Sequence, residues 1–313
     1  MYLFENIIGV FVFDDKISLV EKIMLDLGND QKKEIIIDQL RKKYLDIKEP
    51  DPDTSRKILS FLGRKEFFGQ FRERNLYLTR QDLRKSVNED QFIINSIKSI
   101  AAIEKAANLL AKRVREWYEL YNPEYSRHIA DHEEYLKGII EEDKASLLNK
   151  MKIAQEDSIG ADLKDNDLEP VKELAKKLKG LYESRQNQAE YLSMLMSSYC
   201  PNVNEICGQI ISAKLIEHAG TLKRLSELPA STIQILGAEK ALFRHLKTGA
   251  KPPKHGVIIG HELIAKSPDR LHGKIARLLA DKISIASKID YFHGQYAGDK
   301  LRKEIEEKFS RIK

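Results

Sequence analysis

With 313 residues, of which 32% are charged and 42% hydrophobic, the chain is long enough for about two domains with apolar cores. Two cysteines are too few for a disulfide scaffold, and no apolar run reaches the roughly 18–20 residues that cross a membrane. The net charge of +5 is uneven, because residues 201–313 hold 20 Lys and Arg against 12 Asp and Glu, a balance of +8 that leaves −3 for residues 1–200. A basic rear half favours nucleic-acid binding; a Lys-rich surface that only maintains solubility is the alternative.

Residues 1–88 are predicted to form a small α/β domain. Aromatic and β-branched side chains favour strands at Tyr2–Phe4 and Ile7–Phe13. The spacing of apolar residues predicts a helix over Ile17–Leu27 that ends at Gly28, a residue suited to a left-handed cap, and a second helix over Lys32–Tyr44.

A proline-containing break, KEPDPD, divides this domain. After it, Asp53 is expected to cap a short helix over Ser55–Leu62. Four aromatic residues follow, which either fill the small core or form a docking surface for a partner: Phe67, Phe68, Phe71 and Tyr77.

The middle of the chain is predicted to be a connecting helix over residues 89–123 and an antiparallel coiled-coil hairpin over residues 124–200. Asn122 and Pro123 end the connecting helix, since a residue before proline disfavours the α conformation. The first arm carries Ile129, Leu136, Ile140, Leu147 and Ala154, and the second carries a regular heptad seam. The seam residues expected to pair two chains are Leu168, Val171, Leu178, Tyr182, Leu192 and Met196.

Two features of this region have simple interpretations. His128 and His132 are four residues apart, which predicts one solvated helical face rather than a metal site, because no third ligand is evident. Cys200 and Cys207 are seven apart beside an apolar pattern, which predicts buried thiols in a reducing, cytoplasmic compartment.

Residues 201–313 are predicted to be an all-α domain. Helices are expected over Val203–Ala219, Leu222–Leu228, Ser267–Tyr291 and Lys300–Phe309. On a helical wheel, Arg270, Lys274, Arg277 and Lys288 fall within about 60° of one another. Such a row of cations suits phosphates, although an ordinary solvated amphipathic helix shows the same pattern.

A turn at Gly237 interrupts the apolar helical pattern and restarts a helix near Ala238. We expect its first amides to be open to a phosphate or another polar group, with Glu239 and Lys240 presented together. Phe243 is expected to lie in the core or to stack on a base. A Gly- and Pro-containing loop over Thr248–Gly256 follows.

Three segments, GAEKALFRHLKTG (237–249), PKHGVI (253–258) and GKIARLLADKISIASKIDYF (273–292), together resemble the Nop domain. NLLAKRVREWYELYNPE (108–124) is similar to the segment that leads into that family's coiled coil. The resemblance covers residues 90–310 and is greatest to the archaeal core protein of box C/D guide ribonucleoproteins. It implies a mainly α fold with a small α/β N-terminal domain, a long antiparallel coiled-coil hairpin and an all-α C-terminal Nop domain.

The resemblance further implies an RNA-binding scaffold that is not an enzyme. Its expected partners are fibrillarin, the 2′-O-methyltransferase that binds S-adenosylmethionine, a ribosomal-protein-like kink-turn binder, guide and substrate RNA, and a second copy of the chain. No cofactor, catalytic residue or metal is expected in the chain itself. A structural coiled-coil adaptor, or a spliceosomal-type Nop protein without a methylation role, is the alternative. The residues implied in RNA and ribonucleoprotein binding are Gly237, Ala238, Glu239, Lys240, Ala241, Leu242, Phe243, Arg244, Lys247, Lys254, His255, Arg270, Lys274, Arg277 and Lys288.

Overall fold

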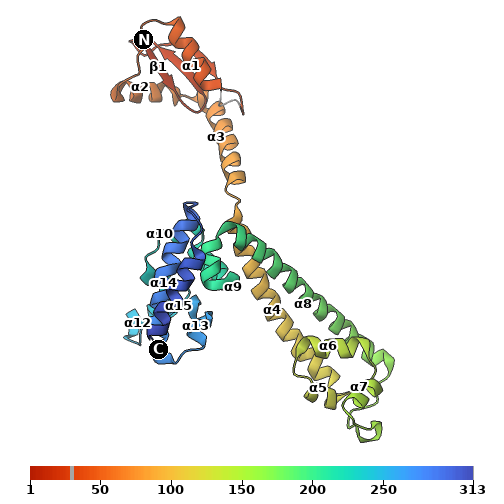
Figure 1. The fold of residues 1–313 in the computed structure, drawn as a ribbon. Helices are drawn as coiled ribbons and strands as arrows, with labels where there is room; N and C mark the ends of the chain where they lie inside the picture. Colours follow the sequence, from red (N-terminus) through yellow and green to blue (C-terminus); the bar gives the residue numbers. More distant parts are fainter. Residues whose placement is uncertain (29–31, 313) are drawn as a thin grey trace. The chain divides into compact units, whose positions relative to one another are not determined.

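The computed structural model describes residues 1–28 and 32–312, and the chain divides into two compact units, Met1–Asn88 and Glu89–Lys313. The first contains a three-stranded sheet and helices, and the second is helical in its described residues (Figure 1). This confirms the predicted fold class, mainly α with a small α/β N-terminal part. In the described residues, no helix combines the length and the apolar character that a membrane crossing requires.

The sheet of the first unit is antiparallel in the order β1 (Tyr2–Glu5), β2 (Gly9–Phe13) and β3 (Leu19–Met24). The predicted helix over Ile17–Leu27 is wrong, because this segment pairs with β2 from Gly9↔Met24 to Phe13↔Leu19. Its apolar residues fit a helical spacing as well as a strand, and only the pairing with the buried β2 decides between them. Gly28 has a φ of +91°, but it follows a strand rather than a helix.

Helices α1 (Lys32–Lys43), α2 (Pro52–Leu62) and α3 (Lys65–Lys85) complete this unit. The cap of α2 is Asp51, whose carboxylate accepts the Thr54 amide at 2.8 Å, so the predicted cap at Asp53 is wrong by two residues. The aromatic cluster is divided: the Phe67 ring is buried edge-to-face on Phe11, whereas the side chain of Phe68 is 68% exposed. Phe67 therefore belongs to the core and Phe68 to the surface.

The second unit begins with a long helical hairpin made by α4 (Glu89–Tyr118) and α8 (Asp165–Tyr199), which lie antiparallel and side by side (Figure 1). The predicted first arm over residues 124–154 is wrong. Those residues instead form the short helices α5 (Pro123–His128), α6 (His132–Glu141) and α7 (Lys144–Lys150), followed by the 3₁₀ turn η1 (Gln155–Asp157).

Local capping explains why residues 124–154 do not form one long arm. Asn122, Asp131 and Asp143 each accept an amide at the start of a short helix, and these caps interrupt the chain every ten or so residues. His128 ends α5 and His132 begins α6, so the predicted shared helical face does not exist. Among the described residues no group of three metal-ligating side chains is found.

The heptad seam of α8 faces its own chain. Leu168 is buried, and Val171, Leu178, Leu192 and Met196 lie in two cores that also contain α4 residues such as Ile97 and Val114. Tyr182 is half-buried. The expectation that these side chains pair two copies is corrected accordingly: the seam closes the hairpin within one chain, because the aligned apolar stripe of α4 already covers it.

The C-terminal part of this unit contains α9 (Pro201–Ala219), α10 (Leu222–Glu227), α11 (Ala230–Ile235), α12 (Glu239–Thr248), η2 (Val257–Gly260), α13 (Glu262–Ala265), α14 (Asp269–Tyr291) and α15 (Gly298–Ile312). The apolar face of α14, with Ile275, Leu279 and Ile283, lies in the core against α9. Cys200 and Cys207 are buried free thiols, as predicted, and burial raises the pKa of Cys207 to about 12.

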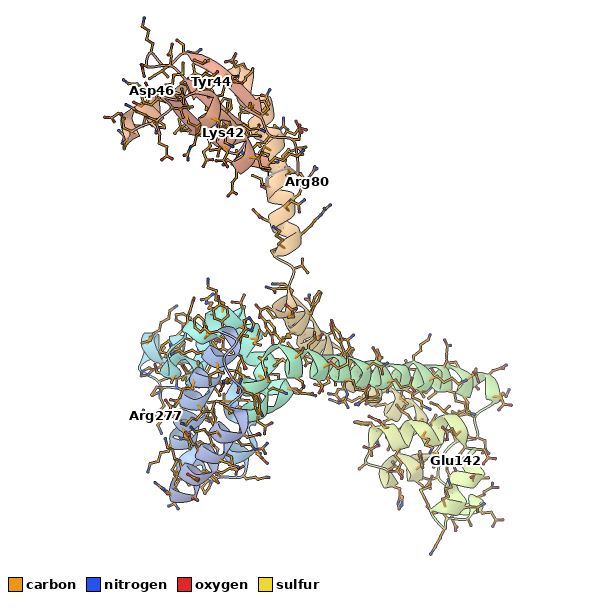
Figure 2. The ribbon with its side chains drawn as sticks, turned by 45° about the horizontal axis from the view of Figure 1, so that its top comes forward. Lys42, Tyr44, Asp46, Arg80, Glu142 and Arg277 are labelled. Carbon is orange, nitrogen blue, oxygen red and sulfur yellow. The ribbon has the colours of Figure 1, made fainter. Side chains whose placement is uncertain are left out.

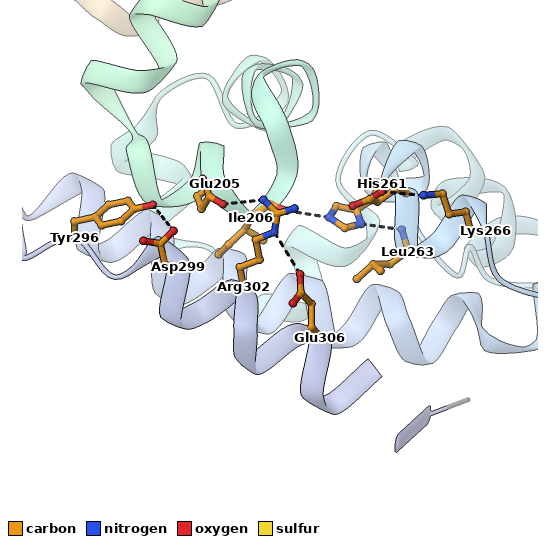
Figure 3. A network of polar contacts seen from close by, with 10 residues as sticks. Glu205, Ile206, His261, Leu263, Lys266, Tyr296, Asp299, Arg302 and Glu306 are labelled. Atoms are coloured by element: carbon orange, nitrogen blue, oxygen red, sulfur yellow. Dashed lines mark hydrogen bonds and ion pairs between the residues drawn. The ribbon is translucent and has the colours of Figure 1, made fainter. Parts of the chain in front are cut away.

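Buried polar groups fasten these helices together. Asp290, at the end of α14, accepts the amides of Asn202 and Val203 at 3.1 and 2.9 Å and so caps the start of α9. His261, before α13, contacts the Ile206 carbonyl through Nε2 at 2.9 Å and the Leu263 amide through Nδ1 at 3.2 Å (Figure 3). Because the amide can only donate, Nδ1 accepts and Nε2 carries the proton, which defines a neutral imidazole.

Candidate nucleic-acid interface

The turn between α11 and α12 requires a glycine. Gly237 has a φ of +87°, and a Cβ there would lie 2.5 Å from Cγ2 of Val257 and 3.1 Å from Nε2 of His218. The turn therefore depends both on the left-handed backbone and on the absence of a side chain. It sets the direction in which α12 leaves the domain.

The amides of Gly237 and Ala238 are not open to a ligand, which corrects the sequence expectation for these two residues. The Gly237 amide donates to Oε1 of Glu239 at 2.7 Å, and the Ala238 amide donates to the Ile235 carbonyl at 2.9 Å. Burial raises the pKa of Glu239, but the hydrogen bonds from the Gly237 and Glu239 amides and the nearby His218 outweigh it, so the pKa is lowered. Glu239 is thus an ionised cap for its own turn, and both Glu239 and Lys240 are exposed.

Helix α12 has no buried residue and presents two adjacent faces to solvent. Lys240, Arg244 and Lys247 are exposed along one face at helical spacing. The next face carries Phe243 and Leu246, whose side chains are 60% and 69% exposed. Of the two alternatives expected for Phe243, this exposure rules out a place in the core. Ala241 and Leu242 are half-buried on the side toward the domain.

The loop after α12 is held against α11 by backbone contacts. The amides of Gly256 and Val257 donate to the carbonyls of Gln234 and Leu236, each at 2.8 Å. A Cβ on Gly256 would lie 1.9 Å from the Leu236 carbonyl oxygen, so only glycine permits this approach. The loop is consequently fixed beside the beginning of α14.

Two predicted residues in this loop have partners within the chain. Nζ of Lys254 lies 2.7 Å from Oδ2 of Asp269, and the Gln234 side chain donates to the Lys254 carbonyl at 2.7 Å. The His255 ring lies 5.7 Å from that of His272, and burial, followed by the nearby His272, lowers the pKa of His255. Lys254 is thus partly neutralised, and His255 is neutral at pH 7.

A basic groove runs between α11 and α14. It is lined by Lys254, Arg270, Lys274 and Arg277 on one side and by Gln234 on the other. Arg277 points away from the helices (Figure 2). Within the described ranges, Arg270, Lys274 and Arg277 have no carboxylate within ion-pair distance. Exposed cations without partners are available to phosphates, and each phosphate contact would release counterions.

The predicted cations therefore fall into three groups. The first is the groove, and the second is the exposed cationic face of α12. Lys288 is the third, since it lies outside the groove near the far end of α14. Sequence reasoning missed Ser231 and Gln234, which line depressions on α11 next to Lys274 and Arg277. The sequence signal for these two residues is weak, since it consists only of their polar character within an apolar stretch.

Residues 99–311 match the family model "Nop: snoRNA binding domain, fibrillarin". An uncharacterised NOP5 family protein of Methanocaldococcus jannaschii is 35% identical over 311 residues, covering 93% of this chain and 75% of that protein. Human nucleolar protein 56 is 36% identical over 254 residues, covering 74% of this chain but only 43% of that protein.

A solved structure of a fibrillarin/Nop5p complex contains a chain that aligns with 99% of this one. Its TM-score is 0.47 at 22% sequence identity.

Proposed function

The chain belongs to the Nop family, and on that premise we propose that it is the RNA-binding scaffold of a box C/D ribonucleoprotein that positions fibrillarin for guide-directed 2′-O-methylation of rRNA or tRNA. The observation that carries this proposal is the groove in which Arg270, Lys274 and Arg277 stand without ion pairs among the described residues. It lies in the part of the chain with a charge balance of +8. The alternative of an adaptor without an RNA role leaves this groove unexplained.

The two faces of α12 suit a composite surface of RNA and protein. Lys240, Arg244 and Lys247 are placed to contact phosphates, and Phe243 with Leu246 to contact a protein that is already bound to the RNA. We assign the protein role to the ribosomal-protein-like kink-turn binder. Gly237 and Glu239 then act indirectly, by fixing the direction of α12.

A gel shift tests the RNA role. Kink-turn RNA bound to the kink-turn protein should be supershifted by the full chain at low salt, and the Lys240→Ala/Arg244→Ala variant should supershift it weakly. Both residues are exposed, so the variant should keep its helicity. The matched control is Lys300→Ala/Lys303→Ala, which removes two exposed cations of α15. Absence of a supershift by the unaltered chain would refute the RNA role.

We assign fibrillarin docking to the first unit, and S-adenosylmethionine to fibrillarin rather than to this chain. The exposed ring of Phe68 and the exposed Leu59 of α2 supply apolar surface in that unit. Co-purification of the full chain with a fibrillarin-like protein tests the assignment, and Phe68→Ser should weaken it while leaving the RNA supershift intact. In keeping with the archaeal relative, we place the assembly in the cytoplasm.

Self-association, if mediated by the hairpin, must use side chains outside the buried seam. Exposed apolar residues on the distal half of α4, Leu109 and Trp117, offer such a surface. Light scattering should then give the mass of two chains, and Trp117→Glu should give the mass of one.

A further inference from the structure

The exposed face of α14 continues well beyond the basic groove. After Arg277 the same three- and four-residue spacing is kept by Asp281, Ile285, Lys288 and Phe292, all of them exposed. On a wheel these residues and the groove cations fall within about 80°, and from Arg270 to Phe292 the face is about 33 Å long. One uninterrupted helical face thus begins with cations and ends with an aromatic ring.

Phe292 is an accessible aromatic ring at the end of α14. Its side chain is 73% exposed, yet it contacts Tyr291 edge-on with ring centroids 4.9 Å apart, and Tyr291 itself packs on the core. The backbone behind it is fixed, because the amides of His293 and Gly294 close the helix on the carbonyls of Asp290 and Ile289. An aromatic side chain has only two rotatable bonds, so little freedom is lost when a ligand covers the open face of this ring.

Two donors of hydrogen bonds flank the ring. Lys288 lies one helical turn earlier and has no carboxylate partner within the described part of the chain. His293 is exposed and has a φ of +52°, at a helix-ending position that glycine usually occupies. An open aromatic face with cationic and imidazole neighbours suits a base and its phosphate, whereas an apolar protein surface would leave Lys288 without a partner.

We propose that Phe292 stacks on an unpaired base of a single-stranded RNA segment that leaves the basic groove along α14. This inference rests on the RNA-binding role proposed above and extends the footprint to the far end of the helix. Arg270, Lys274 and Arg277 contact phosphates at the first half of α14. Asp281 repels phosphates at its centre, so the strand is held at two separate places, the groove and the ring.

The test compares two RNAs on the full chain with the kink-turn protein present. One is a kink-turn RNA alone, and the other carries a single-stranded extension of about ten nucleotides. The extension should tighten binding by the unaltered chain about tenfold. Phe292→Leu, which keeps the apolar volume but removes the aromatic ring, should lose this gain and bind the unextended RNA normally. Tyr191→Leu, at an exposed tyrosine of α8, is the matched control and should keep the gain.

The outcomes separate this inference from the broader function. An unaltered chain that binds both RNAs equally, or a Phe292→Leu variant that keeps the gain, overturns the stacking position while the scaffold role stands. Failure to bind even the unextended RNA removes both. Loss of a protein partner by Phe292→Leu in the absence of RNA identifies the ring as a protein contact and also overturns the proposal. A 5-iodouridine in the extension should crosslink to Phe292.

Discussion

Gly237 and Gly249 both adopt a left-handed backbone conformation, but they have different structural roles. Both have positive φ, +87° and +69°, and they bracket α12. A Cβ on Gly249 would have no atom within 4 Å, whereas one on Gly237 would meet Val257 and His218. Gly249 therefore only ends a helix, while Gly237 also holds the start of α12 close to η2.

We expect Gly237→Ala to reduce the free energy of unfolding by more than Gly249→Ala. Each substitution incurs the left-handed strain of about 1–2 kcal/mol, and only the first adds a steric conflict, of about 1 kcal/mol or more. Urea unfolding followed by circular dichroism measures both variants. The RNA supershift should weaken only for Gly237→Ala, since only that change moves α12. Equal effects of the two substitutions would contradict the role given to the Gly237 turn.

We expect the buried His261 to make the free energy of unfolding depend on pH. Burial lowers its pKa and outweighs the hydrogen bond to the Ile206 carbonyl, which raises it. A lowered folded-state pKa means that the unfolded chain binds the proton first, so stability is present above about pH 6.5 and falls as the pH decreases below it, by up to about 1.4 kcal/mol per pH unit. Urea unfolding at pH 7.0 and 5.5 measures the fall.

His261→Asn supplies the control for that measurement. Asn can still accept the Leu263 amide but does not titrate, so the variant should be less stable at pH 7.0 and should lose less on acidification. Asp90 and Asp290, whose pKa values are raised by burial, remain in both proteins and cancel in the comparison. An identical pH dependence in the two proteins would exclude His261 as its source.

At the scale of elements, the hairpin shows that an apolar stripe needs a partner of matching length and regularity. Helix α8 has 35 residues, and α4, with 30, comes nearest to it in length among the helices of the described residues. The segment between them is divided by the caps at Asn122, Asp131 and Asp143 and folds into short helices around Tyr118, Tyr125 and Tyr135. The hairpin is therefore complete within one chain.

Leu178→Ala should destabilise the hairpin by about 2–5 kcal/mol, because the side chain is fully buried and its removal leaves a cavity. Since the seam is intramolecular, this loss should be the same at low and high protein concentration. Met194→Ala, at a side chain 66% exposed on the same helix, is the control and should be almost neutral. A loss of stability that depends on protein concentration would instead indicate that the seam packs between two chains.

At the scale of the whole molecule, the sheet and the basic groove lie in different structural units. The unit Met1–Asn88 contains the sheet, and the basic groove with α12 lies in Glu89–Lys313. If the two proposed activities are also divided, RNA binding should be a property of the second unit and fibrillarin binding a property of the first.

The dependence of RNA affinity on salt measures this division. The full chain and a fragment of residues 89–313 should show the same slope of log K against log salt concentration. Lys274→Ala and Arg277→Ala should each reduce that slope by about one, if each contacts one phosphate. Filter binding over a series of salt concentrations gives the slopes. A clearly shallower slope for the fragment would place phosphate contacts in the first unit.

The sequence alone determined the turn at Gly237, the buried cysteines, the row of cations on α14 and the helices of the C-terminal part, except for the break in α9 at Gly208, where φ is +72°. These are set by local properties: apolar periodicity, the conformational freedom of glycine and residue charge. It also determined that α8 has one apolar face, but not which helix covers that face. A periodic pattern specifies the direction of a side chain and not the identity of its neighbour.

Only the tertiary structure decided the remaining points, each through contact between segments distant in sequence. Pairing with β2 makes residues 19–24 a strand although their spacing also fits a helix. Packing on α4 turns the seam inward. The Glu239 carboxylate accepts the hydrogen bond of the Gly237 amide, which was expected to be open. Few residues pack against α12, so Phe243 stays exposed. Burial and strand pairing depend on which residues are neighbours in three dimensions. The type and spacing of the residues in one segment do not specify those neighbours.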